Sequence, residues 1–165
     1  MNIASLLDRA QQLLATAVSV QNQAASYLHK LPGFSFDETM AGPITLEHQN
    51  HPQHMEFRIH AEVASLGSFL SDGRTSISGT VSIPGLADSA ALSGSLWIWP
   101  HKRILRYEFS FARNDGSPCR FAGQKDVSPL DLVETMTALP SYLYDAHGHE
   151  IGQAEVRFDL SDLPT

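Results

Sequence analysis

The hydrophobic pattern of this 165-residue chain changes its period at Pro32-Gly33, and this change limits the folds open to it. Before that dipeptide, apolar residues recur at three- and four-residue steps, as in an amphipathic helix. After it, apolar and polar residues alternate, as in strands with one buried and one solvated face. The pattern therefore predicts an N-terminal amphipathic helix within residues 1–32, packed on the barrel or on a partner, and a β-domain over residues 33–165.

Alternation is clearest in the segments MEFRIHAEV, TSISGTVSI and RILRYEFSF. Turn signals such as Asn114-Asp115-Gly116 and His147-Gly148-His149 separate about eight short segments of this kind. A sheet with one apolar face cannot be a parallel sheet covered on both sides. We expect a mainly β fold, a single antiparallel up-and-down barrel with a calycin-like plan. The alternative is a strongly curved open sheet wrapped round the N-terminal helix.

Composition narrows the partners and the compartment. The net charge is −7 and there is no run of Lys or Arg, so nucleic acid and anionic membrane surfaces are poor partners. Cys119 is the only cysteine, which rules out an internal disulfide and favours a reducing cytoplasm. The first twelve residues, MNIASLLDRAQQ, resemble neither a signal peptide nor a membrane span.

An ordered series of segments carries a resemblance to a known family. FDETMAG is followed by SLGSFLSDG, SGTVSIPGL, ILRYEFSFARNDGSPCRFAGQKDV and LVETMTALPSYLYD. In this order, over about residues 34–160, the chain resembles the β-rich accessory domain found beside bacterial flavin oxidoreductases of the glucose–methanol–choline, cholesterol-oxidase-like type. The resemblance implies an accessory role next to a flavoenzyme partner and no catalytic residues. The chain itself has no Gly-rich dinucleotide fingerprint, so we expect no cofactor of its own.

Glu38 is the residue that fits the alternation least comfortably. In FSFDETMAG it shares a face with Phe34, Phe36 and Met40, so a carboxylate points at a core. Lys125 shares the face of Phe121 in the same way. Because an unpaired buried charge is costly, we expect Glu38 and Lys125 to form an ion pair inside the barrel or at its mouth. Such a pair can fix the register of strands, anchor a ligand or serve acid–base catalysis.

Other reactive groups give weaker signals. His48, His51, His54 and His60 cluster in sequence, but His60 points outward and the others lie in a polar loop, so we expect no metal site. Cys119 falls on the apolar face of its strand and is expected to be a core residue. The segment LWIW, residues 96–99, is apolar on both faces, so the N-terminal helix or a second subunit is expected to cover one of them.

These observations favour a non-enzymatic barrel of accessory or binding type over an enzyme. The alternatives are a small isomerase or cyclase that uses Glu38 as an acid or base, and a purely structural partner of a larger enzyme. Any ligand is expected to be small and apolar. Its predicted contacts are apolar at Phe34, Phe36, Met40, Tyr107, Phe109 and Phe121, and polar at Glu38 and Lys125.

Overall fold

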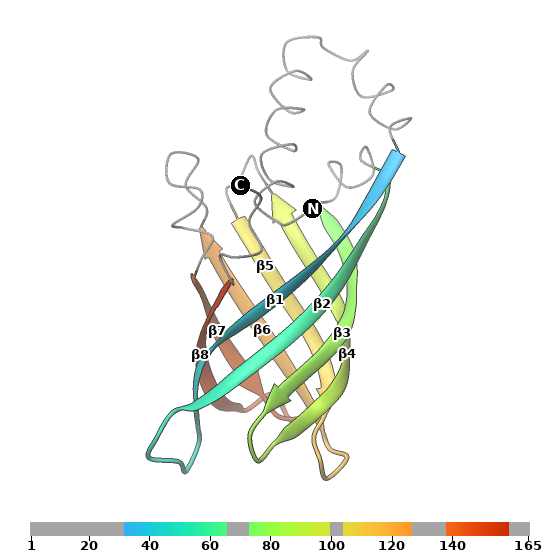
Figure 1. Ribbon diagram of the computed structural model, residues 1–165. Coiled ribbons are helices and arrows are strands. Elements are labelled where there is room, and N and C mark those ends of the chain that lie inside the picture. Colours follow the sequence, from blue (N-terminus) through green and yellow to red (C-terminus); the bar gives the residue numbers. More distant parts are fainter. Residues whose placement is uncertain (1–31, 66–72, 100–103, 127–137, 159–165) are drawn as a thin grey trace.

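The computed structural model describes residues 32–65, 73–99, 104–126 and 138–158 (Figure 1). The predicted N-terminal helix lies outside these ranges. Within the described ranges all regular structure is β, in eight strands. The strands are β1 (Pro32–Leu46), β2 (Gln53–Ser65), β3 (Arg74–Ile83), β4 (Ala87–Trp99), β5 (Ile104–Ala112), β6 (Pro118–Asp126), β7 (Ala138–Tyr144) and β8 (Glu150–Phe158).

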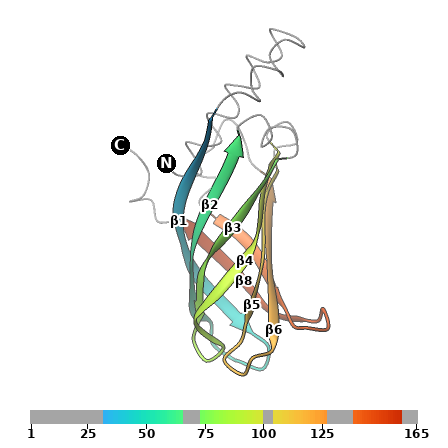
Figure 2. The ribbon, with the colours of Figure 1, turned by 90° about the vertical axis from the view of Figure 1, so that its right-hand side faces the viewer.

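The eight strands form a closed antiparallel barrel in which each strand pairs with its neighbours in sequence and β1 pairs with β8. The up-and-down barrel predicted from the alternation is therefore confirmed, and the open curved sheet is excluded. The tight turns between β1 and β2, β3 and β4, β5 and β6, and β7 and β8 gather at one end, the lower end of Figures 1 and 2. We call the opposite end, where β1 begins and β2 ends, the upper end.

Aromatic side chains fill the middle of the barrel. Phe109 and Phe121 lie opposite each other on β5 and β6, and their rings stack with centroids 4.6 Å apart. Phe57 of β2 meets both rings edge-on, at 5.1 Å and 5.3 Å, and its ring lies 6.2 Å from that of Tyr107. Edge-to-face and offset contacts of this kind are the preferred aromatic geometries. The predicted core position of Cys119 is also confirmed, because its side chain on β6 is only 3% exposed.

Two seams of the barrel are short. β1 pairs with β8 only from Met40 to Leu46, so above Met40 its described ladder partner is β2 alone. β6 pairs with β7 only over Arg120–Gly123. Pro140 explains the second seam, because proline has no N–H to continue the ladder. The ladder of β7 with β8 has an irregularity of its own between Leu143 and Tyr144.

Glycines make room where strands approach closely. Gly94 of β4 lies opposite Phe109 of β5. A Cβ at Gly94 would overlap the Glu108 carbonyl and come within 2.8 Å of the Phe109 Cβ. The Glu108 oxygen is a backbone atom and the Phe109 Cβ is bonded directly to the backbone, so neither can move away by side-chain rotation.

We therefore expect Gly94→Ala to lower the free energy of unfolding by about 1–3 kcal/mol, the usual cost of overpacking a core. Gly152→Ala is the matched control, because its nearest obstacle, the Leu46 Cδ2 atom at 3.1 Å, is the end of a side chain. Urea unfolding of both variants measures the difference. Equal losses would show that the close approach at Gly94 does not constrain the barrel.

Candidate functional site

A carboxylate and a phenol meet inside the barrel. Glu38 lies on the inner face of β1 and only 5% of it is exposed. The Tyr107 hydroxyl, fully buried on β5, donates to both carboxylate oxygens at 2.9 Å and 3.1 Å. Because β1 and β5 are not neighbours in the barrel, this contact spans the interior rather than following a ladder. The prediction that Glu38 faces the core is confirmed.

The environment keeps Tyr107 in its donor form. Burial raises the pKa of Tyr107 well above its ordinary value, and the negative charge of Glu38 and the hydrogen bond to it act in the same direction. Ionising the phenol would place a second negative charge beside the carboxylate in a low-dielectric interior. The hydroxyl is therefore a hydrogen-bond donor to Glu38 throughout the physiological pH range.

The predicted ion pair between Glu38 and Lys125 is wrong: in the described part of the chain no salt bridge joins them. The Lys125 ammonium instead donates to the carbonyl of Ala138 at 2.6 Å. The sequence analysis treated Tyr107 only as an apolar residue and so overlooked its hydroxyl as the partner of Glu38. A tyrosine among phenylalanines on an inward face is itself a signal that a buried acceptor is near.

The structure brings most of the predicted ligand contacts into one core. Phe36, Met40, Tyr107, Phe109 and Phe121 are each no more than 2% exposed. A side chain that lined an open cavity would keep accessible surface, so these residues are packed against one another. The backbone of Phe34 pairs with Val63, while its side chain lies outside the described part of the chain.

A buried serine, which the sequence analysis missed, belongs to the same region. Gly123 of β6 lies opposite Tyr107 on one side and opposite Ser141 of β7 on the other. Ser141 is 2% exposed and donates to the Leu139 carbonyl at 3.0 Å. A Cβ at Gly123 would come within 2.6 Å of the Ser141 Oγ and within 2.7 Å of the Leu139 Cδ2, so a side chain at this position would collide with both residues.

Glu38 and Tyr107 form the interior polar pair, which we call the anchor cluster, and Ser141 of β7 is a further buried polar residue. Lys125 is the next inward residue of β6 above Gly123, and as a diagonal neighbour its Cα is expected roughly 7–8 Å from that of Tyr107. Apolar walls with a few convergent polar groups are the usual composition of a small-molecule site.

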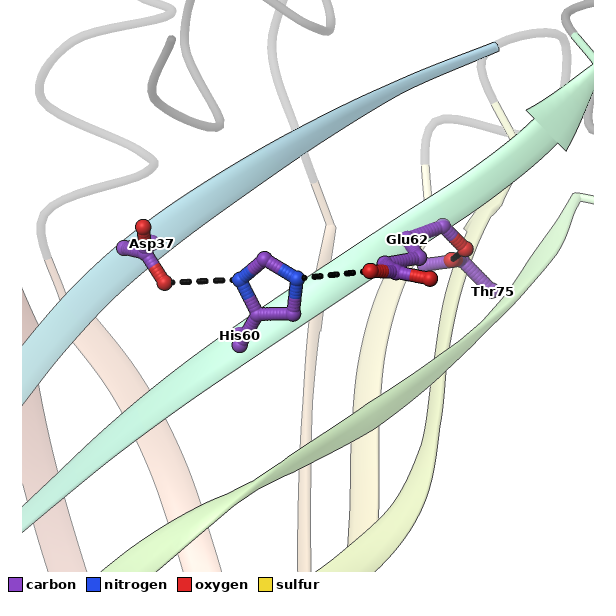
Figure 3. A network of polar contacts seen from close by, with 4 residues as sticks. All are labelled: Asp37, His60, Glu62 and Thr75. Atoms are coloured by element: carbon purple, nitrogen blue, oxygen red, sulfur yellow. Dashed lines mark hydrogen bonds and ion pairs between the residues drawn. The ribbon is translucent and has the colours of Figure 1, made fainter.

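A second polar network lies on the outer face of β1 and β2 (Figure 3). His60 of β2 pairs directly with Asp37 of β1, and its Nδ1 lies 2.8 Å from the Asp37 carboxylate. Its Nε2 lies 3.1 Å from the Glu62 carboxylate. On the inner face of β3, the buried Thr75 hydroxyl donates to the backbone carbonyl of Glu62 at 2.5 Å and so joins β3 to β2 beneath this network. The outward orientation of His60 is as predicted, but its two partners were not.

The double contact sets the protonation of His60. A carboxylate only accepts hydrogen bonds, so both ring nitrogens must carry a proton for both contacts to form. The hydrogen bonds to Asp37 and Glu62 raise the pKa of His60, and burial opposes them only weakly. Figure 3 shows the two ring nitrogens facing opposite ways, Nδ1 toward Asp37 on β1 and Nε2 toward Glu62 on β2 itself.

Two surface hollows lined by described residues contain none of the predicted ligand contacts. One, of about 540 Å³, lies at the lower end and is lined by polar residues such as His54, Glu56 and Asp88. The other, of about 370 Å³, lies between Thr45–Glu47 and Glu150–Gln153. Among the described residues no group of His, Cys, Asp and Glu is placed to hold a metal ion. In the same ranges there is no helix of the length and apolarity needed to cross a membrane.

No protein-family model, no curated protein and no solved structure matches the chain.

The pair of Glu38 and Tyr107 can be tested by a double-mutant cycle. Tyr107→Phe should lower the free energy of unfolding by roughly 1–3 kcal/mol, because the buried carboxylate loses a donor. Adding Tyr107→Phe to a Glu38→Met background should cost clearly less. Tyr142→Phe, on the exposed outer face of β7, is the control and should be nearly neutral. Additive losses in urea unfolding would contradict the pairing.

The His60 network predicts a pH-dependent contribution to stability. Because folding raises the pKa of His60, its contribution is complete below the unfolded value of 6.5 and is lost as the pH rises through the folded value. The difference in unfolding free energy between the natural protein and His60→Gln should therefore be greatest below pH 6.5 and shrink as the pH rises above that value. His54→Gln, also exposed on β2, is the control. A difference that stays constant or grows with pH would overturn the assignment.

Proposed function

We propose that the chain is a non-enzymatic, calycin-like β-barrel of accessory or binding type that holds a small apolar ligand near the upper end of the barrel. The observation that carries the proposal is the contact between Glu38 and Tyr107 across the interior. Removing a carboxylate from water is expensive, and strand register alone does not require it, because the ladders already set the register. A polar anchor for a ligand supplies a reason for keeping it there.

The carboxylate also restricts the class of ligand. A second negative charge near Glu38 would be repelled strongly in a low-dielectric interior. A hydroxyl or an amine instead offers a donor to an acceptor-only group. The proposed ligand therefore has an apolar body and a neutral or cationic head group that can donate a hydrogen bond.

Because the aromatic cluster of Phe57, Phe109 and Phe121 fills the middle of the barrel, we propose that the ligand lies above it. Entry at the upper end requires side chains or strands there to move apart. The short seams favour this, because β1 above Met40 has β2 as its described ladder partner and β6 is not paired with β7 above Gly123.

An accessory role beside a flavin oxidoreductase, in the bacterial cytoplasm, is part of the same proposal. Its support is the ordered series of segments from FDETMAG to LVETMTALPSYLYD and the single, buried Cys119. A second copy of the chain is the other partner we propose, with its contact expected at the segment LWIW as the sequence predicts.

The alternative function is a small isomerase or cyclase with Glu38 as its acid or base. The same buried pair favours it, because a carboxyl group in an apolar interior is a common general acid or base. Turnover whose rate follows the titration of one group and disappears in Glu38→Gln would favour the enzyme. Binding without turnover would favour the proposed function.

Three probes of equal chain length test the proposal: 1-decanol, decylamine and decanoate. We expect calorimetry to show binding of the alcohol and the amine and little or none of the acid. Glu38→Gln should remove most of the discrimination against decanoate, because the repelling charge is gone. Glu62→Gln, on the outer face of β2, is the charge-matched control and should leave the ranking unchanged. Failure of all three probes to bind would refute the proposed function.

A further inference from the structure

Two arginines on the outer face of β5 and β6 converge on one carboxylate. Glu108 accepts a hydrogen bond from Arg106 Nη2 at 2.9 Å through one oxygen and from Arg120 Nη1 at 3.1 Å through the other. The Arg120 Cζ lies 4.6 Å from the ring centroid of Tyr144, a cation–π contact. The Arg106 Cζ lies 6.0 Å from the ring centroid of Trp97. Both guanidinium groups are therefore held in place, and two positive charges share one negative charge.

A small side chain stands in the middle of this face. Ala122 of β6 pairs with Glu108 of β5 on one side and with Tyr142 of β7 on the other. Arg120 precedes Ala122 on the same outward register. Tyr142 is 42% exposed and is the one large hydrophobic side chain that stands out among the described surface residues. Arginine and tyrosine are the residues most enriched at the centres of protein interfaces, which makes this face a candidate docking surface.

The charges elsewhere on the barrel indicate the kind of partner. The whole chain has a net charge of −7. On the outer faces of β1 and β2 three carboxylates accompany a single arginine; these residues are Asp37, Glu56, Glu62 and Arg58. An acidic partner is therefore repelled by most of the protein and attracted to the face with Arg106 and Arg120, which fixes where it docks.

Nucleic acid fits this face less well than an acidic protein does. A phosphate backbone is bound by a continuous row of positive charges that displaces its counterions. Here Glu108 lies between the two arginines, and Asp126 ends the outward register of β6. Separate carboxylates, spaced by apolar side chains, match an interrupted pattern of this kind.

We propose that the arginine face, made of Arg106, Glu108, Arg120, Ala122, Tyr142 and Tyr144, docks an acidic segment of another protein. A carboxylate of the segment binds Nε and Nη2 of Arg120, which hydrogen-bond to no described residue, in the paired geometry typical of arginine. A neighbouring apolar side chain of the segment packs on Ala122 against the Tyr142 ring. The face lies outside the barrel, so it is separate from the interior ligand site of the proposed function.

An NMR titration of the folded, isotope-labelled protein tests the proposal. The probe is a peptide of alternating Glu and Leu, about eight residues long, which spans roughly 26 Å when extended. Peptides of alternating Gln and Leu and of alternating Lys and Leu are the comparisons. We expect only the acidic peptide to shift the amide signals of Glu108, Ala122 and Tyr142. At about 1 M salt, where the Debye length is about 3 Å, this binding should weaken strongly.

Two variants separate the arginine from the surface around it. Arg120→Gln should weaken binding of the acidic peptide about five- to tenfold, as loss of an interface arginine commonly does. Arg58→Gln is the matched control, because Arg58 is also an exposed arginine paired with a carboxylate, Glu56, but lies on β2. Ala122→Trp keeps both arginines and covers the place of the apolar side chain. It should weaken binding to a similar extent while leaving urea unfolding nearly unchanged, since tryptophan is well tolerated on the outer face of a strand.

Four results would overturn the inference. The first is no shift of these amides with the acidic peptide, and the second is equal weakening by Arg120→Gln and Arg58→Gln, which would show a general response to charge. The third is tighter binding of an oligothymidylate than of the acidic peptide at the same amides, which would make the occupant a nucleic acid. The fourth is self-association of the natural protein that Ala122→Trp abolishes, which would make the occupant a second copy.

Discussion

The ladder between the first and last strands is the constraint on which the rest of this structure depends. Pairing of β1 with β8 turns a meander into a barrel, and closure is what gives the inner face its separate, water-excluded environment. Only in that environment does the contact between Glu38 and Tyr107 become a buried one. Within this closed sheet Gly94 and Gly123 lie so close to a neighbouring strand that a side chain at either position would collide with it.

The fold could be predicted from the sequence because its signals are local. Alternation in MEFRIHAEV and RILRYEFSF decides which side chains face inward, and turns such as Asn114-Asp115-Gly116 decide that successive strands are antiparallel. Closure was preferred but not established, because pairing of β1 with β8 joins segments more than a hundred residues apart and leaves no local signature.

The sequence predicts which face of its own strand each site residue takes, but it does not predict which residue of another strand it meets. Alternation correctly turned Glu38 inward, but choosing its partner required knowing how far β1 and β5 are staggered around the barrel. Lys125 was the natural electrostatic partner by composition, whereas the barrel places its ammonium against a backbone carbonyl at the β6–β7 seam. Ser141 was missed because it stands next to Pro140, in a segment whose alternation the proline interrupts.

The outer His60 network and the inner contact of Glu38 with Tyr107 are linked through β1, because each uses one of two adjacent residues of that strand. Asp37 and Glu38 are consecutive, so one faces His60 on the surface and the other faces Tyr107 in the core. Above Met40 the described ladder of β1 is made with β2 alone, and the contacts of His60 with Asp37 and Glu62 add to it where the β8 ladder has ended. Protonation of His60 therefore stabilises the attachment of β2 to the stretch of β1 that carries Glu38. The interior carboxylate of Glu38 and the surface imidazole of His60 thus both act on the same stretch of β1, although neither touches the other.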